Sequence, residues 1–208
     1  MSTVTKTQPD ARIRLLDAAM QVIRAKGYSA TTVDDICREA GLTKGAFFHH
    51  FKSKEDLALA AAAHFAQMAD GLFSTAPYRQ AADPLGRLLG YIDFRAAIMD
   101  GPIPAFTCLL GTMVQEAYDT HPAIRRACDT YIGAHAAGVA QDIEAAKALY
   151  APQATWSAQS LALHTQAVLQ GAFVLAKSRG GPEIARDCLA HLRRYVRQLF
   201  HQPTSKEE

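Results

Sequence analysis

The chain has 208 residues, of which 49% are hydrophobic and 20% are charged, a balance that fits a packed globular protein and excludes a disordered one. The net charge of +2 excludes a polycation. Residues 1–60 nevertheless carry 9 Lys/Arg against 7 Asp/Glu, whereas residues 61–208 carry 13 of each. The excess positive charge therefore lies at the front of the chain, which favours contact with nucleic acid there.

Cysteine usage and hydropathy indicate a reducing compartment. The N-terminal segment lacks the apolar core of a signal peptide, and no uninterrupted apolar stretch is long enough to cross a bilayer. The four cysteines lack the spacing of a zinc site or a disulfide framework and are Cys37, Cys108, Cys128 and Cys188. We therefore expect a cytoplasmic protein with no membrane contact, no metal site and no cofactor.

Apolar residues recur with helical period along nearly the whole chain, and no segment alternates as a strand would. An all-α fold is therefore predicted. The first helix is expected over residues 12–26, where Gly27 ends it. Two short helices joined by a tight turn are expected next, and the capped start of another helix follows them.

Side chains that cap helices define these two short helices. Thr32 begins the first, and Asp35 follows three residues later in the manner of a capping box. Gly41 ends that helix where a left-handed residue is needed, and Thr43 can cap the second. Ser53 is placed to cap the helix after that. This order of caps predicts a helix-turn-helix.

The second short helix is free of negative charge. No acidic residue occurs between Glu39 and Glu55. The basic or titratable residues in that interval are Lys44, His49, His50, Lys52 and Lys54. Phe47 and Phe51, four residues apart, are expected in the core. A helix-turn-helix of this kind is suited to approach phosphate, so the pattern indicates DNA binding.

Six further helices are expected over residues 54–73, 84–99, 106–119, 122–150, 157–179 and 183–201. The chain therefore divides into a three-helix helix-turn-helix domain at residues 1–56 and a larger helical domain at residues 57–208. We expect the larger domain to bind an effector and to form a dimer.

The two final helices carry apolar residues on more than one side, although one row suffices to pack each helix on its own domain. Small residues among them would let two backbones approach closely. We therefore expect a homodimer formed through a four-helix bundle. The residues expected at its interface are Val168, Gly171, Ala172, Leu175, Leu189, Val196 and Phe200.

Residues 11–57 resemble the tetracycline repressor (TetR) family of bacterial regulators. The resemblance depends on three segments in the same order, GYSATTVDDI, AGLTKGAFFHHF and KSKEDL. It implies a dimeric repressor whose first three helices bind a palindromic operator. It also implies that the larger helical domain binds a small molecule and then releases the DNA.

By position, the resemblance assigns base contacts to Thr43, Lys44, Gly45, Ala46 and His49. It assigns contacts with the sugar-phosphate backbone to Thr32, Phe48, His50 and Lys54. The family commonly has tyrosine in place of Phe48, and phenylalanine cannot donate the same hydrogen bond to phosphate. The physical chemistry agrees for Lys44, which can donate to guanine, and for Gly45 and Ala46, whose small size lets the helix enter the groove deeply.

An effector pocket is expected in the larger domain, with apolar walls and a few polar groups. Its candidate residues are Phe65, Met68, Phe94, Cys108, Met113, Tyr131, His135 and His164. Each of them, taken singly, is more often an ordinary core residue. Tyr131 and His135 are one helical turn apart and could together bind a ligand oxygen or an acidic group.

The leading hypothesis is a ligand-responsive repressor, and three alternatives stay open. Cys108 could instead make the protein an electrophile- or redox-sensing repressor, although unpaired cysteines on apolar segments are usually buried. An enzyme is disfavoured because the nucleophile elbow, the zinc-protease motif and the phosphate loop are all missing. A DNA binder without an effector would not need so long a second domain. Metal binding by His49 and His50 is also disfavoured, because adjacent side chains on a helix point apart.

Overall fold

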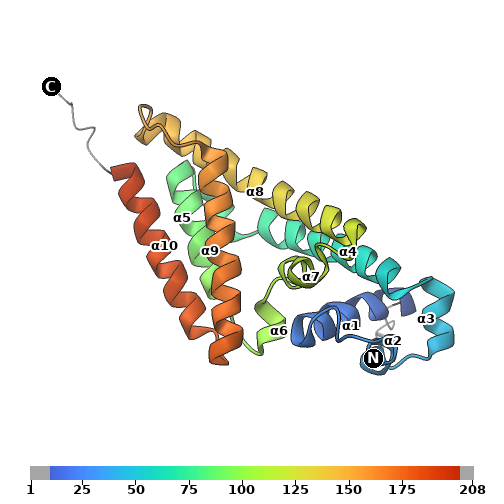
Figure 1. The fold of residues 1–208 in the computed structure, drawn as a ribbon. Helices are drawn as coiled ribbons and strands as arrows, with labels where there is room; N and C mark the ends of the chain where they lie inside the picture. The colour runs from blue at the N-terminus through green and yellow to red at the C-terminus, as the bar shows by residue number, and fades with distance from the viewer. Residues whose placement is uncertain (1–9, 202–208) are drawn as a thin grey trace, which may run out of the picture.

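The computed structural model describes residues 10–201 and places them in ten α-helices and one short 3-10 helix (Figure 1). No strand occurs in this range, so the predicted all-α fold is confirmed. No helix in it combines the length and hydropathy needed to span a bilayer. The outer ends of the two expected domains, residues 1–9 and 202–208, lie outside the described residues.

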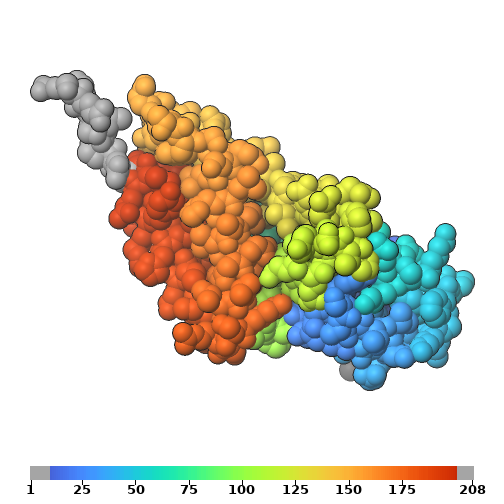
Figure 2. Space-filling model, viewed as in Figure 1, coloured from blue at the N-terminus to red at the C-terminus, as the bar shows by residue number. Residues whose placement is uncertain are grey.

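The molecule is elongated, and different helices form its two ends (Figures 1 and 2). One end is formed by α1 (Ala11–Lys26), α2 (Val33–Ala40) and α3 (Lys44–His50). The connecting elements are α4 (Lys54–Ser74), η1 (Pro77–Gln80), α5 (Pro84–Ala97), α6 (Ile103–Phe106), α7 (Leu109–Ala117) and α8 (Pro122–Tyr150). The opposite end is formed by α9 (Ala158–Arg179) and α10 (Glu183–His201).

The helix expected over residues 106–119 corresponds to the shorter α7, and the short helix α6 that precedes it was not expected. Helix α6 ends at Phe106, Thr107 and Cys108 are extended, and α7 begins directly after them. The Cys108 Sγ accepts a hydrogen bond from the Gly111 backbone N–H at 3.4 Å and so caps α7. Because a thiol is only a weak acceptor, the sequence pattern gave no sign of a cap at this position.

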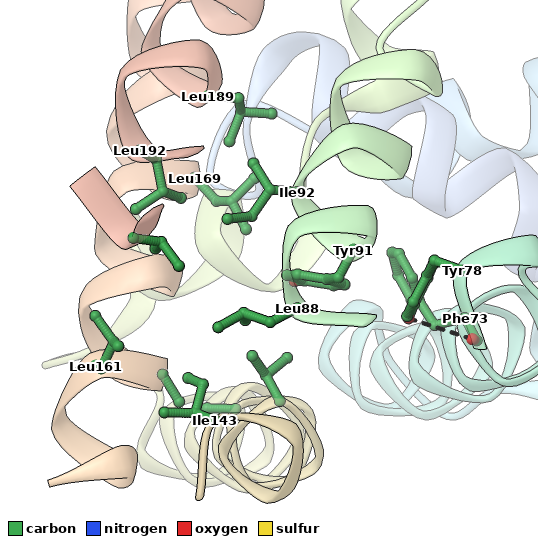
Figure 3. Close-up of a cluster of buried hydrophobic side chains, with 14 of the residues drawn as sticks. Phe73, Tyr78, Leu88, Tyr91, Ile92, Ile143, Leu161, Leu169, Leu189 and Leu192 are labelled. Atoms are coloured by element: carbon green, nitrogen blue, oxygen red, sulfur yellow. Dashed lines mark hydrogen bonds between the residues drawn. The ribbon is translucent and has the colours of Figure 1, made fainter. Parts of the chain in front are cut away.

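The buried side chains form two clusters. The first cluster joins α1, α2 and α3 to the first half of α4, to α7 and to the start of α8, and it contains Phe47 and Phe51 as expected. The second cluster joins the end of α4 to α5, α8, α9 and α10 (Figure 3). Helix α4 contributes to both, with Leu57 and Ala61 in the first cluster and Phe73 in the second. The domain boundary expected after residue 56 stays a prediction.

The expected dimer interface needs correction, because four of its seven residues belong to the chain's own second cluster. These four, each at most 5% exposed, are Ala172, Leu189, Val196 and Phe200. Figure 3 shows Leu189 of α10 beside Ile92 of α5. Val168 is partly buried against the same cluster, and Gly171 and Leu175 face outward. Helical periodicity reveals two apolar rows but does not say which row faces the chain's own core.

Hydrogen bonds connect three polar side chains at this second cluster. Gln166 Nε2 donates to the Tyr91 hydroxyl oxygen at 3.2 Å, and that oxygen lies 2.9 Å from His135 Nε2. Burial, together with the charges of Arg95 and Arg79, lowers the pKa of His135 to about 4. The imidazole is therefore neutral at pH 7, and its Nε2 can accept the tyrosine proton.

His135 predicts a loss of stability in acid. Its pKa is about 4 in the folded chain and 6.5 in its ordinary state, so the unfolded chain binds more protons between these two pH values. We expect the free energy of unfolding to fall as the pH drops from 6.5 to 4, by up to about 1.4 kcal/mol per pH unit from this group. Urea titrations of the wild type and of His135→Gln would measure this slope.

The His135→Gln variant should lose less stability on acidification than the wild type does. His164→Gln, which changes an exposed histidine of α9, serves as the control and should keep the wild-type slope. Equal slopes for all three proteins would show that His135 does not cause the acid sensitivity.

Candidate nucleic-acid interface and adjoining cavity

The caps expected from the sequence set the ends of α2 and α3. Thr32 and Asp35 form the capping box of α2, in which each side chain accepts a hydrogen bond from the other residue's backbone N–H. Gly41 ends α2 in the left-handed region, with φ +62°. Thr43 Oγ1 accepts from the Ala46 N–H at 3.2 Å and starts α3. The turn between the two helices is therefore confined to residues 41–43.

One face of α3 packs inward and the other is open. Phe47 is fully buried, whereas its neighbour Phe48 is 59% exposed. Of the residues predicted to contact bases, Thr43, Lys44, Gly45 and His49 are exposed and Ala46 is partly buried. His50, predicted to contact the sugar-phosphate backbone, is partly buried as well. Helix α3 lies at the far end of the molecule from α9 and α10, and no other helix of residues 10–201 covers its outer face (Figure 1).

The glycine at position 45 is not required by the packing of α3 itself. A Cβ atom there would meet nothing closer than Thr43 Oγ1 at 3.6 Å, which is ordinary contact. Glycine inside a helix is less favourable than alanine by about 1 kcal/mol. The close approach of another surface to the helix backbone would give this glycine a use.

Lys44 is held by a carboxylate of α2. Its Nζ lies 2.8 Å from Asp34 Oδ1, and both side chains are more than half exposed. The hydrogen bond that Lys44 donates to the Asp34 carboxylate raises the pKa of Lys44, so the ammonium stays charged. Because exposed ion pairs are weak, the lysine can exchange Asp34 for an acceptor on another molecule at little cost.

Lys54 does not extend into solvent. Its ammonium donates to the backbone carbonyls of Tyr28 at 3.0 Å and Thr31 at 2.9 Å, and it lies 4.4 Å from the centre of the Tyr28 ring. Burial lowers its pKa. Lys54 therefore joins the loop after α1 to the start of α4, and this geometry argues against the expected phosphate contact.

His49 and His50 contact one another edge to face, with ring centroids 4.9 Å apart. Residues 10–201 contain no group of three or more His, Cys, Asp or Glu side chains placed to hold a metal ion. His49 is exposed and His50 is partly buried on α3.

A cavity of about 520 Å³ lies where the two buried clusters meet. Five of the eight residues expected at an effector pocket line it, namely Phe65, Met68, Cys108, Tyr131 and His135. The other three do not. Met113 is fully buried in the first cluster, Phe94 packs against Phe73, and His164 contacts the Tyr195 ring on the exposed side of α9.

Several lining residues carried no signal in the sequence. The most informative are Met20 and Arg24 of α1, Arg95 of α5, and Gln166 and Gln170 of α9. Helix α1 was assigned to the helix-turn-helix domain, and only the fold brings it against α6 and the cavity. Basic residues on an amphipathic helix are normally read as solvated, so Arg24 and Arg95 gave no reason to expect otherwise.

Arg24 connects α1 to the segment between α6 and α7. Its guanidinium donates to the carbonyls of Ala105 and Thr107, each at 3.4 Å, and its Nε donates to the Met20 carbonyl at 3.0 Å. Burial lowers the pKa of Arg24, and the neighbouring Cys108 opposes this shift. Arg24 therefore lines the cavity and belongs to α1, the helix that packs against α2 and α3.

Family models match both parts of the chain. The model described as "Bacterial regulatory proteins, tetR family" matches residues 15–61. The model described as "Tetracyclin repressor-like, C-terminal domain" matches residues 84–192, which is more than half of the chain.

Curated relatives match over the first of these regions. The HTH-type transcriptional regulator YerO of Bacillus subtilis is 42% identical over 55 residues, which cover 26% of this chain and 19% of that protein. The transcriptional repressor KstR2 of Mycolicibacterium smegmatis is 43% identical over 58 residues, which cover 27% of this chain and 28% of that protein. The matches therefore span about a fifth to a quarter of these relatives.

Solved structures match over nearly the whole chain. The regulatory protein TetR from Rhodobacter sphaeroides has a TM-score of 0.79 at 26% identity and covers 91% of this chain and 98% of its own. The reduced form of Escherichia coli NemR has a TM-score of 0.74 at 23% identity, covers 94% and 100%, and shows the same fold. From these matches and from its helix-turn-helix, the chain belongs to the TetR family of DNA-binding transcriptional regulators, which is not a family of enzymes.

Proposed function

We propose that this regulator is a repressor that binds a palindromic operator as a dimer and is released by a small molecule. The observation that carries the proposal is the position of the cavity. It is lined by residues of α1 and α4. Helix α1 packs directly against α2 and α3, and the first half of α4 supports them through the first cluster. A molecule in the cavity would therefore contact the same helices that hold α3 in place. A regulator of this kind works where the DNA is, in the cytoplasm.

Helix α3 is the proposed reading helix. Thr43, Lys44 and His49 present hydrogen-bonding groups on its exposed face, and Gly45 and Ala46 keep the approach to base edges open. Phe48 would contact sugar or a thymine methyl. Thr32 and His50 would contact the sugar-phosphate backbone, and the exposed Lys52 replaces Lys54 as the nearby phosphate contact.

The proposed dimer forms through the outward faces of α9 and α10. Leu163, Val174, Leu175 and Tyr195 are 42–47% exposed there, although all are large and apolar or aromatic. Gly171 lies among them, and a Cβ atom at this position would meet nothing within 4 Å. A second copy would cover this face and could approach the glycine closely. This interface would place the two α3 helices at the outer ends of the dimer.

The proposed release is a shift between two states of the dimer. Operator binding requires the two α3 helices to enter successive major grooves on one side of the duplex, about one helical turn apart. An effector that binds better to a dimer with another separation of its α3 helices weakens operator binding by that difference in affinity. The contacts of Arg24 and the length of α4 provide the mechanical connection.

Lys44→Ala should weaken binding to the specific operator by about 5- to 150-fold, because a donor to guanine is lost. Fluorescence anisotropy would measure this on fragments from upstream of the protein's own gene, at several salt concentrations. Sedimentation of the wild-type complex should give two chains per site. Arg126→Ala removes an exposed positive charge from α8 and should leave the affinity unchanged.

Two results would count against this assignment. Failure of the wild type to form a salt-sensitive complex with any fragment would reject the proposed operator binding. Equal weakening by Lys44→Ala on every DNA sequence would assign the lysine to phosphate rather than to a base.

A second candidate function, sensing of electrophiles through Cys108, gains support from the fold. No basic residue lies near Cys108 in sequence, but Arg24 and Lys177 both interact with it electrostatically in the structure. Cys108 is a free, partly exposed cysteine that lines the cavity, where a small electrophile could reach its sulfur. If Cys108 is the sensor, N-ethylmaleimide should abolish operator binding by the wild type and by Cys188→Ser, but not by Cys108→Ser. Full operator binding by the alkylated wild type would reject this function.

A further inference from the structure

Arg95 is a residue of the cavity wall with a buried polar side-chain atom that no hydrogen bond satisfies. Its Nε is buried and has no hydrogen-bond partner among residues 10–201. Its guanidinium carbon lies 5.1 Å from the centre of the Phe73 ring and 5.7 Å from that of the Phe173 ring. The two rings therefore hold the guanidinium in position, and its Nε–H donor has no acceptor among the described residues.

The other arginines near Arg95 already have partners. Arg24 donates to backbone carbonyls, as described above. Arg79 and Arg87 share the carboxylate of Asp142, at 2.8 Å and 2.7 Å. Arg95 therefore contributes a positive charge to the cavity that no carboxylate in the described part of the chain neutralises.

The rest of the wall suits the body of an amphipathic molecule. Aromatic rings supply much of it, from Phe65, Phe73, Phe106, Tyr131 and Phe173. The amides of Gln166 and Gln170 add neutral polar groups. The single acidic lining residue, Asp70, is exposed. The interior of the cavity therefore combines one unpaired cation with apolar surface.

We propose that the cavity takes an organic acid with an apolar body, whose carboxylate accepts hydrogen bonds from Arg95. The planar guanidinium presents parallel N–H donors that match the two oxygens of a carboxylate. The body of the acid lies against the aromatic side chains of the wall. This inference rests on the proposed function in treating the cavity as the effector site, and it adds the chemical class of the effector.

The test compares ligands that differ only in the head group. The probes are 4-phenylbutyrate and 8-phenyloctanoate, together with the alcohols and the amines of the same skeletons. Calorimetry at pH 7.5 on the full-length protein without DNA would give each dissociation constant. We expect at least one carboxylate to bind tenfold or more tightly than its alcohol, and the amines to bind most weakly of all.

Arg95→Gln should remove the preference for the carboxylate while leaving the affinity for the alcohol within about threefold. Arg126→Gln makes the same change of charge at an exposed position of α8 and should keep the preference. The wild-type comparison of head groups needs no variant, so it stands even where Arg95→Gln fails to fold.

Equal affinities for carboxylate and alcohol in the wild type would overturn the inference, as would the absence of carboxylate binding at millimolar concentrations. Retention of the preference by a folded Arg95→Gln would also overturn it. Operator binding is measured separately on the ligand-free protein. Normal operator binding without a carboxylate preference would reject only the ligand class, whereas a carboxylate preference without operator binding would reject only the proposed function.

Discussion

Helix α4 is one continuous helix of 21 residues, and its start and its end are buried in the first and the second cluster, respectively. At its start, Leu57 and Ala61 pack under the helix-turn-helix, and at its end Phe73 packs among α5, α8 and α9. An α-helix of this length spans about 30 Å and resists compression. Movement at one end must therefore be transmitted to the other end or be absorbed by repacking. The proposed coupling between the cavity and the helix-turn-helix depends on this constraint.

The cavity adjoins both clusters, so the proposed effector would act on their relative position without unfolding either one. Cys108 packs against both clusters, and Arg24 reaches from α1 to the carbonyls beside Cys108. Close-packed interiors tend to switch between discrete arrangements rather than deform continuously. On the proposed function, a molecule bound at this junction would favour one arrangement of α1, α2 and α3 relative to α9 and α10.

The helix-turn-helix was predictable because its determinants are local. The capping pairs of Thr32 with Asp35 and of Thr43 with Ala46 each lie within one helical turn. Gly41 is the residue type that most readily adopts the left-handed conformation found at the end of α2. The cavity was only half predictable, because Arg24 and Arg95 acquire their surroundings from segments distant in sequence. The same reason explains why Leu189, Val196 and Phe200 of α10 were expected at the dimer interface but lie in the chain's own core. Their periodicity is local, but the choice of partner is not.

The proposed coupling between the cavity and the helix-turn-helix can be tested without knowing the effector. Ala69 of α4 lines the cavity and is partly buried, so Ala69→Trp would place an indole ring inside it. Ala63, exposed on the same helix, gives the matched control Ala63→Trp. The direct measurement is the operator affinity of both folded variants. We expect Ala69→Trp to bind the operator at least tenfold more weakly than Ala63→Trp. Equal affinities, with the cavity of Ala69→Trp closed to phenylalkanoates that bind the wild type, would contradict the coupling.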